Sequence, residues 1–191
     1  ALRNANHCPA GVYIWPSPQS ALVWDCVFFV HQGYYNNAVL KLRLMFPATY
    51  PAAPPAVHFA TDVFHPLVSQ RDGLFSLSPR FSDWSPSRHH VYDVLHFIKA
   101  SFKKDTLKLK DTDCFNKEAL RLYRENTSSF AALAAQSATL SQSKSALFDR
   151  DHPTLVGKGR DSVIFKETAP DALAKMRASL GLEEWTLGNF E

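Results

Sequence analysis

The sequence contains little cysteine. Its 191 residues include three, Cys8, Cys26 and Cys114, and their odd number and spacing match no disulfide or metal-ligand pattern. We therefore expect a chain from a reducing compartment such as the cytoplasm. No Gly-rich phosphate loop is present either, and we expect neither a cofactor nor a metal.

Long apolar runs and strong charge are also missing. No run approaches the ~20 apolar residues of a membrane-spanning helix, and no signal peptide is visible. The formal net charge is only +3, and Lys and Arg are scattered apart from a short cluster at residues 103–110. We expect no direct membrane insertion and no nucleic-acid binding, because nucleic-acid binding needs a basic stripe. The hydrophobic content of 46% is typical of a globular chain.

Alternating hydrophobic patterns predict four strands, at residues 12–16, 22–31, 38–46 and 56–60. In the third, Leu40 and Leu42 alternate with Lys41 and Arg43, which predicts a sheet with one buried face and one face in water. Short connections, including a hairpin loop at 32–37, favour an antiparallel meander.

Helical periodicity follows these strands. Ser85-Pro86 is typical of a helix start, and the apolar residues from Val91 to Phe102 then recur at helical spacing. Another apolar stripe begins at Asp113 and continues weakly toward Phe148. The predicted fold class is α+β, with helices packed on a four-stranded antiparallel meander.

The last part of the chain reads as an appendage. Residues 1–148 are predicted to form the domain, the polar residues 149–162 a linker, and residues 163–191 a C-terminal extension with a short helix. Within the extension, Thr168 to Asp171 predicts a helix start and Gly181 a helix stop.

The densest motif runs from Phe46 to Pro66. It reads F-P-x-x-Y-P-x-x-P-P-x-V-x-F and then H-P, which resembles the core of the ubiquitin-conjugating enzyme family. Trp84-Ser85-Pro86 resembles the start of that family's second helix, and the Asn116-to-Tyr123 segment resembles its third. The resemblance covers residues from about 11 to 135 and implies the ubiquitin-conjugating (UBC-like) fold. It assigns structural roles to Pro47, Tyr50, Pro51, Pro55, Trp84 and Pro86.

Two further segments narrow the resemblance. Residues 11–42 and the tail LFDRDHP…VIFKETAPDALAKM are similar to the AKT-interacting protein, or Fused Toes, family of catalytically silent variants. In conjugating enzymes a first helix would precede Gly11. Only Ala1 to Cys8 could belong to it here, so we expect most of that helix to be missing.

The resemblance also shows which chemical groups have been lost. Conjugating enzymes carry ubiquitin as a thioester on a cysteine about ten residues past the histidine of His-Pro-Asn, and the asparagine supports the oxyanion. This chain has no cysteine between His65 and Trp84, and Leu67 replaces the asparagine. The nucleophile position falls on Ser76, or on Phe75 if the loop is aligned without its extra residue. We predict a vestigial site and no enzymatic activity, with His65 kept to support a turn.

Other groups are weaker catalytic candidates. Cys26 lies on a predicted core face, we expect Cys114 on a different side of the fold from the usual site, and Cys8 belongs to a terminus. His89 and His90 are adjacent, so on a helix they point about 100° apart and do not suit a metal. We expect solvated or capping histidines.

The extension is the better indication of function. It carries more apolar surface than a linker needs, and we predict that Phe165, Leu173, Met176, Leu180 and Trp185 bind a partner. The alternative is that this segment packs back on its own domain.

The resemblance implies a non-enzymatic adaptor. Such relatives bind a Hook-type coiled-coil protein and an FHIP-type helical-repeat protein, in a complex that connects endosomal or vesicular cargo to microtubule motors such as dynein. The expected location is cytoplasmic, peripheral on vesicles through partners. Two alternatives remain: a variant that binds ubiquitin weakly on its sheet side, and an active enzyme with a displaced nucleophile.

Overall fold

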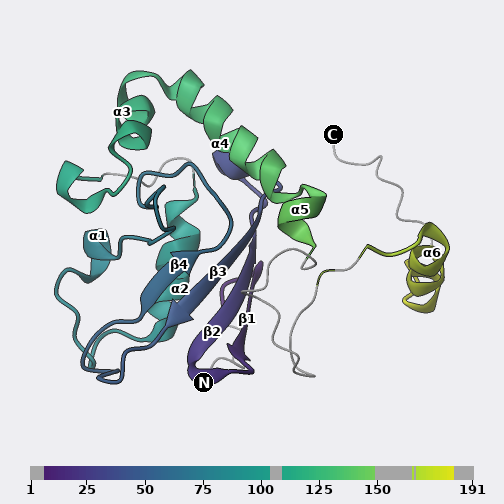
Figure 1. Cartoon of the computed structure of the whole chain (residues 1–191), viewed down its shortest axis with the longest axis horizontal. Coiled ribbons are helices and arrows are strands. Elements are labelled where there is room, and N and C mark those ends of the chain that lie inside the picture. Colours follow the sequence, from purple (N-terminus) through teal and green to yellow (C-terminus); the bar gives the residue numbers. More distant parts are fainter. Residues whose placement is uncertain (1–6, 104–108, 149–164, 166, 183–191) are drawn as a thin grey trace.

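The computed structural model describes residues 7–103, 109–148, 165 and 167–182 (Figure 1). The predicted linker at 149–162 and Trp185 lie outside these residues, so the division into domain, linker and extension stays a prediction. The described residues form an α+β arrangement with a helix in the C-terminal extension, as the sequence predicted.

The sheet has four strands: β1 (Val12–Ser17), β2 (Ser20–Phe29), β3 (Val39–Met45) and β4 (Ala56–Phe59). They pair antiparallel in the order β1-β2-β3-β4, which confirms the predicted meander. Cys26 lies opposite Leu42, and Leu42 lies opposite Phe59. Since directly opposed residues share a face, the apolar residues of three strands meet on one side of the sheet.

The helices are α1 (Ser78–Phe81), α2 (Val91–Ser101), α3 (Lys117–Glu125), α4 (Thr127–Ser141), α5 (Lys144–Leu147) and α6 (Pro170–Ser179). Two short 3-10 helices lie at Gly33–Tyr35 and Asp111–Asp113. Helix α2 covers one face of the sheet, α3 to α5 follow one another past its end, and α6 stands apart (Figure 1). In the part of the chain that the structure describes, no helix has the length and apolar character needed to cross a membrane.

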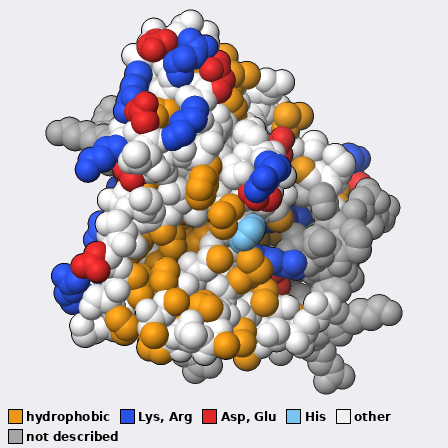
Figure 2. Space-filling view, turned by 60° about the vertical axis from the view of Figure 1, so that its left-hand side comes forward, with side chains coloured by type: hydrophobic (Ala, Val, Ile, Leu, Met, Phe, Trp, Pro, Cys, Tyr) orange, Lys and Arg blue, Asp and Glu red, His pale blue; other side chains and the backbone are white. Residues whose placement is uncertain are grey.

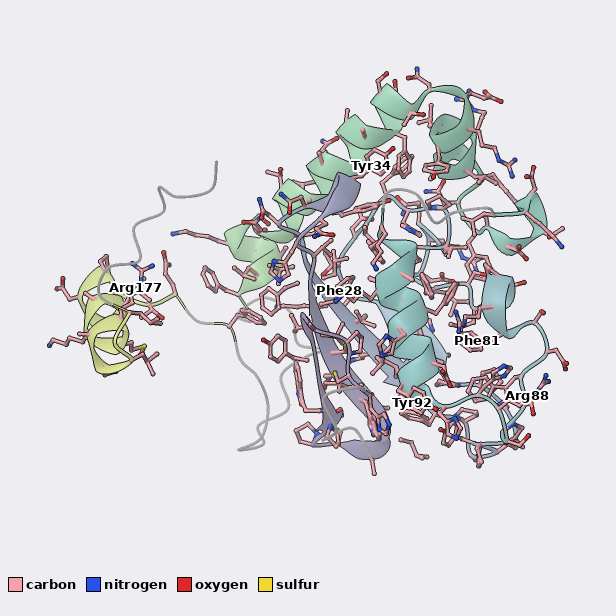
Figure 3. All side chains as sticks on the ribbon, turned by 180° about the vertical axis from the view of Figure 1, so that it is seen from behind. Phe28, Tyr34, Phe81, Arg88, Tyr92 and Arg177 are labelled. Carbon is pink, nitrogen blue, oxygen red and sulfur yellow. The ribbon has the colours of Figure 1, made fainter. Side chains whose placement is uncertain are left out.

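The core lies between the sheet and α2. Phe28 reaches from β2 to Phe102, with ring centroids 5.6 Å apart in an edge-to-face arrangement (Figure 3). Helix α2 adds Val94, Leu95 and Ile98, which are all buried. Because each large apolar side chain contributes roughly 1.5–3 kcal/mol on burial, this interface supplies much of the stability of the domain.

The second helix begins later than predicted. Ser85 and Pro86 belong to a separate turn, in which the N–H of His89 donates to the carbonyl of Ser85 at 2.8 Å. Helix α2 starts at Val91, where the N–H of His90 donates to the carboxylate of Asp93 at 2.8 Å. A side chain that caps the first turn defines the helix start here more strongly than the proline does.

The long C-terminal stripe is divided into three helices. The Asn126 N–H donates to the carbonyl of Leu122 at 2.9 Å, and its side-chain oxygen accepts from the N–H of Ser129 at 3.1 Å. Asn126 therefore ends α3 and caps α4. Ser143 starts α5 in the same way, accepting from the N–H of Ala146 at 3.3 Å. Local capping by Asn and Ser interrupts a pattern that periodicity alone reads as continuous.

The outer face of the sheet is not wet throughout, so that prediction is wrong at Lys41. Lys41 is only 3% exposed, and its ammonium group donates to the carbonyl of Leu147 at 2.7 Å. The acceptor lies 106 residues further along the chain. Alternation within one strand reports which face a residue occupies, and it contains no information about what later covers that face.

Helix α6 starts without the predicted side-chain cap. Its first residue is Pro170, preceded by Ala169, and Thr168 lies outside the helix. The predicted stop is confirmed: Gly181 has φ of +68°, and the N–H of Leu182 donates back to the carbonyl of Arg177 at 2.9 Å. This geometry is typical of a glycine-terminated helix.

Charged and hydrophobic side chains gather at opposite ends of one face (Figure 2). At the upper end, α3 forms exposed ion pairs such as Arg121–Glu118 at 2.7 Å. At the lower end, hydrophobic side chains gather near the proline-rich turn at 47–55, which connects β3 to β4. Exposed ion pairs contribute about 1 kcal/mol or less to the free energy of unfolding, so the charges on α3 keep this surface solvated and add little stability.

One glycine fixes the loop that leads to the predicted vestigial site. Gly73 has φ of +72°, its N–H donates to the carbonyl of Ser69 and its carbonyl accepts from the N–H of Phe59, both at 2.8 Å. A methyl group on Gly73 would collide with the carbonyl oxygen of Phe59. The close backbone approach and the positive φ both require glycine.

We predict that Gly73→Ala lowers the free energy of unfolding by about 3 kcal/mol, through left-handed strain and overpacking against the backbone. Denaturant unfolding followed by circular dichroism measures this. Gly181→Ala is the matched control, because Gly181 has a similar φ of +68° but no atom within 4 Å of the added methyl group. Equal midpoints for the two variants would mean that the contact with Phe59 does not constrain the loop.

Candidate functional site

The site is built on a buried histidine turn. His65 has no exposed surface, and its Nδ1 accepts a hydrogen bond from the N–H of Leu67 at 3.0 Å. The other ring nitrogen, Nε2, therefore carries the proton and donates to the carbonyl of Ser101 at 3.0 Å. The ring stacks on Phe102 with centroids 4.7 Å apart. Both nitrogens are committed to main-chain groups, which gives His65 the turn-supporting geometry that the sequence suggested.

Burial also controls the charge of this histidine. Desolvation lowers the pKa of His65 to about 4, and the hydrogen bond to Ser101 offsets only part of that shift. His65 is neutral at physiological pH. With both nitrogens occupied, it has no free acceptor with which to take a proton from a neighbouring hydroxyl.

The predicted nucleophile position lies beside this turn. The N–H of Ser76 donates to the carbonyl of Leu67 at 2.8 Å, and Val68 pairs with Phe75. The pairing sets Ser76, rather than Phe75, opposite Leu67. The Phe75 ring instead packs into the core, 5.7 Å from Phe59. The side chains of Leu67 and Ser76 are both buried, so the pair presents no exposed reactive group.

The turn before α3 closes over the same region. The N–H of Asn116 donates to the carbonyl of Pro66 at 3.0 Å, and the Asp113 carboxylate accepts from the Ser78 hydroxyl at 2.9 Å. Cys114 lies between these two contacts. The expectation that Cys114 sits on a different side of the fold is therefore wrong, because a chain reversal that local pattern cannot reveal brings it back.

None of the three thiols is set up as a nucleophile. Burial raises the pKa of Cys114 to about 11 and raises the pKa of Cys26 further. It also raises the pKa of Cys8, whose thiol donates to the carbonyl of Val12 at 3.2 Å. A thiol must ionise to attack a thioester, and these three stay protonated at neutral pH. Cys26 is a buried core residue, as its strand position suggested.

The proline-rich turn and Trp84 contact each other. The indole N–H of Trp84 donates to the carbonyl of Pro51 at 2.8 Å, and the ring of Tyr50 lies 4.9 Å from that of Phe46. Of the other proposed structural residues, Pro55 is buried and Pro47 is half-buried, whereas Pro86 is exposed. Trp84 thus ties the loop that follows the vestigial site to the end of the sheet.

The extension separates into two parts. Leu173 and Met176 on α6, and Leu180 directly after its last residue, are 42, 55 and 72% exposed. Phe165 behaves differently: its ring lies 6.4 Å from that of Phe29, and the Lys41 ammonium lies 5.1 Å from its centroid. Phe165 thus packs on its own domain, which is the alternative given above for this segment, and partner binding by these residues stays a prediction. The apolar content of the extension could not distinguish an intramolecular contact from an intermolecular one.

Sequence reasoning missed the residues that hold the extension. The sequence pattern places Lys41 on a solvent-facing side of the sheet. It does not predict the ion pair between Lys144 and Glu167, which is 2.7 Å long. No local signal marks these contacts, because the partners lie far apart in sequence. Among the described residues, no group of three or more His, Cys, Asp or Glu side chains is arranged to hold a metal ion.

Comparisons with known proteins point to one family. The ubiquitin-conjugating enzyme family matches residues 2–138. An AKT-interacting protein of Xenopus tropicalis is 32% identical over 183 residues, which cover 93% of this chain and 59% of the frog protein. Protein crossbronx of Drosophila virilis is 32% identical over 146 residues, covering 73% of this chain and 59% of the fly protein. The AKT-interacting protein of Danio rerio is 33% identical over 141 residues, covering 73% of this chain and 46% of the fish protein. The chain therefore spans about half of the length of these curated relatives.

We predict that His65 makes stability depend on pH between its ordinary pKa of 6.5 and its folded pKa of about 4. In that window the unfolded chain binds a proton that the native chain excludes, so stability falls by about 3 kcal/mol as pH falls through it. Hydrogen bonds, that from Ser69 first, lower the pKa of Asp72 to about 2, so Asp72 contributes only at lower pH. Denaturant unfolding at a series of pH values measures the slope.

His65→Asn is the control for this slope. It keeps a short acceptor for the Leu67 N–H but does not titrate between pH 4 and 6.5. The free energy of unfolding of this variant should be lower at pH 7 and should change less with pH across the window. A variant that keeps the whole wild-type slope would assign the pH dependence to other groups.

Proposed function

The chain belongs to the ubiquitin-conjugating enzyme family, and we propose that it is a member without thioester chemistry that works as a non-catalytic adaptor. Its proposed assembly is a complex of the FTS–Hook–FHIP type, in which a Hook-type coiled-coil protein and an FHIP-type helical-repeat protein are the partners. The complex would link endosomal or vesicular cargo to microtubule motors, with this chain in the cytoplasm and peripheral to the vesicle. The name AKT-interacting protein, borne by two of the relatives, also describes protein binding.

One observation carries the loss of chemistry. Leu67 in the histidine turn and Ser76 opposite it are both buried, where the reaction needs a polar donor and an ionised thiol. A serine hydroxyl needs a neighbouring base, and both nitrogens of His65 are occupied. Ser76, Leu67 and His65 together fill space and satisfy the backbone, which supports a structural role for the former site.

The adaptor role rests on the exposed stripe of α6. Leu173, Met176 and Leu180 are spaced three and then four residues apart, the spacing that places apolar side chains along one seam of a coiled coil. All three are exposed, as are single apolar residues elsewhere such as Leu22 and Leu140, but these three follow one another in a row. Exposed apolar side chains in one row support a docking contact with a helix of a partner.

The alternatives receive less support. Binding of ubiquitin on the sheet side would have to compete with Phe165, which packs beside Lys41 on the outer face. A displaced nucleophile would need an ionised thiol, and burial raises the pKa of Cys8, Cys26 and Cys114.

We predict that the chain forms no thioester when incubated with activating enzyme, ATP and ubiquitin. Non-reducing electrophoresis measures this, with an active conjugating enzyme as positive control. A reductant-sensitive ubiquitin adduct that disappears in Cys114→Ser would overturn the proposal.

Restoring sulfur alone should not restore turnover. Ser76→Cys leaves Leu67 without a donor for the oxyanion, and losing one such donor costs ~100–1,000-fold in hydrolases. Ser76→Cys/Leu67→Asn is the matched variant that restores both groups. If Ser76→Cys transferred ubiquitin to lysine at the rate of an active enzyme, the loop would have kept a functional geometry.

We predict that Met176→Asp/Leu180→Asp weakens binding to a Hook C-terminal fragment by about 2 kcal/mol or more, roughly 30-fold in Kd. The domain should stay folded, because both side chains are exposed. Calorimetry measures the affinity and circular dichroism the fold. Ala174→Asp/Ala178→Asp adds the same charge to another face of α6 and should bind normally. Unchanged affinity of the stripe variant would exclude this row as the contact, and a sharp fall in its melting temperature would assign the row to the core.

A further inference from the structure

The outer face of the sheet is covered around its centre. Asp25, Val27 and Lys41 point away from α2, as their alternation with the core residues Cys26 and Leu42 requires, yet all three are buried. Asp25 accepts a hydrogen bond from the Arg43 guanidinium at 2.7 Å, which satisfies one charge. Lys41 is satisfied by parts of the chain that lie beyond the sheet.

Lys41 joins two segments from the C-terminal part of the chain. Its ammonium donates to the carbonyl of Leu147 at the last turn of α5, at 2.7 Å, and lies 5.1 Å from the Phe165 ring centroid. A cation is favoured both by the carbonyl end of a helix and by the face of an aromatic ring, and each attraction strengthens where water is excluded. Phe29 adds a second ring contact to Phe165, with centroids 6.4 Å apart.

A second contact lies two residues further on. The Glu167 carboxylate pairs with the Lys144 ammonium on α5 at 2.7 Å. Both side chains are largely exposed, so this pair adds orientation more than affinity. The domain thus contacts one segment at two positions, through the aromatic residue Phe165 and the acidic residue Glu167 two positions later.

The chain length does not force this contact. Sixteen residues separate Phe148 from Phe165, enough to reach many places on the domain at up to about 3.3 Å per residue. Chain length alone therefore does not account for the contact of Phe165 with Lys41 and Phe29.

We propose that the outer face of the sheet around Lys41, together with Lys144 on α5, is a peptide-binding site for an aromatic–x–acidic segment, occupied in cis by Phe165 and Glu167 of this chain. This site is distinct from the α6 stripe and does not depend on the adaptor role. Because α6 begins at Pro170, three residues after Glu167, occupancy of the site also tethers the start of that helix.

The test uses the full chain and a variant that vacates the site, Phe165→Ala/Glu167→Ala. The probe is a fluorescent peptide of residues 161–169, DSVIFKETA, measured by anisotropy. We expect binding to the vacated variant to be at least about tenfold tighter than to the unaltered chain, where the cis segment competes at high effective concentration. A peptide with Ala in place of Phe165 should lose at least about tenfold in affinity, since the ring is the anchor.

A charge exchange tests the second contact. Lys144→Glu in the vacated variant should lower the affinity for the peptide a few-fold. A peptide carrying Lys in place of Glu167 should recover that affinity. Equal peptide binding to the unaltered chain and the vacated variant, or binding to neither at millimolar peptide, would overturn the proposal.

Chemical labelling gives a second readout on the unaltered chain. Acylation of Lys41 by a succinimidyl ester, followed by mass spectrometry with exposed Lys175 as reference, should be about tenfold slower in the unaltered chain than in the vacated variant. Leu173→Ala is the control, because it changes the α6 stripe and should leave Lys41 protected. Equal labelling of Lys41 in the unaltered chain and the vacated variant would show that Phe165 does not cover it.

Discussion

His65 connects three parts of the fold through main-chain hydrogen bonds that require it to be neutral. Nδ1 holds the Leu67 N–H, and Nε2 holds the carbonyl of Ser101 at the end of α2. The carbonyl of Pro66, the next residue, accepts from the N–H of Asn116 before α3. The turn thereby fixes the position of both helices relative to the segment that ends at Ser76. A charged imidazole could not accept from Leu67, and the Ser101 carbonyl alone would offset only part of its desolvation, which is why the low pKa and the geometry belong together.

This constraint explains how the fold tolerates apolar side chains beside the histidine turn. The histidine acts on the backbone and needs no thiol beside it, so Leu67 and Ser76 can take up positions that an enzyme would reserve for polar groups. Leu67 is fully buried, and Phe75 sends its ring toward Phe59 and Phe97. Apolar side chains in these places add packing energy that a solvated active site gives up. Burial of Leu67 and Phe75 therefore favours the stability of this region over the solvation that a polar site would need.

The C-terminal extension divides its apolar side chains between two tasks. Phe165 is used inside the molecule, where Lys41 and Phe29 receive it. Leu173, Met176 and Leu180 stay exposed on α6, which the glycine at 181 ends cleanly. One segment can thus be anchored and still present an apolar row, because the anchor and the row lie on opposite sides of Pro170. This separation supports the proposed adaptor role, because the anchored residue and the exposed row do not compete for the same contacts.

The sequence by itself determined the sheet, its order and the family, because strand alternation and the proline-rich motif are local. It also determined that no cysteine lies between His65 and Trp84, which is a matter of residue identity. Helix boundaries were less predictable: the caps at His90 and Asn126 overrode periodicity and the proline at 86. Only the tertiary structure decided that Lys41 is buried, that Cys114 lies near the histidine turn, and that Phe165 is an internal anchor. Each of these depends on contacts between residues far apart in the chain, and such contacts leave no periodic trace in either segment.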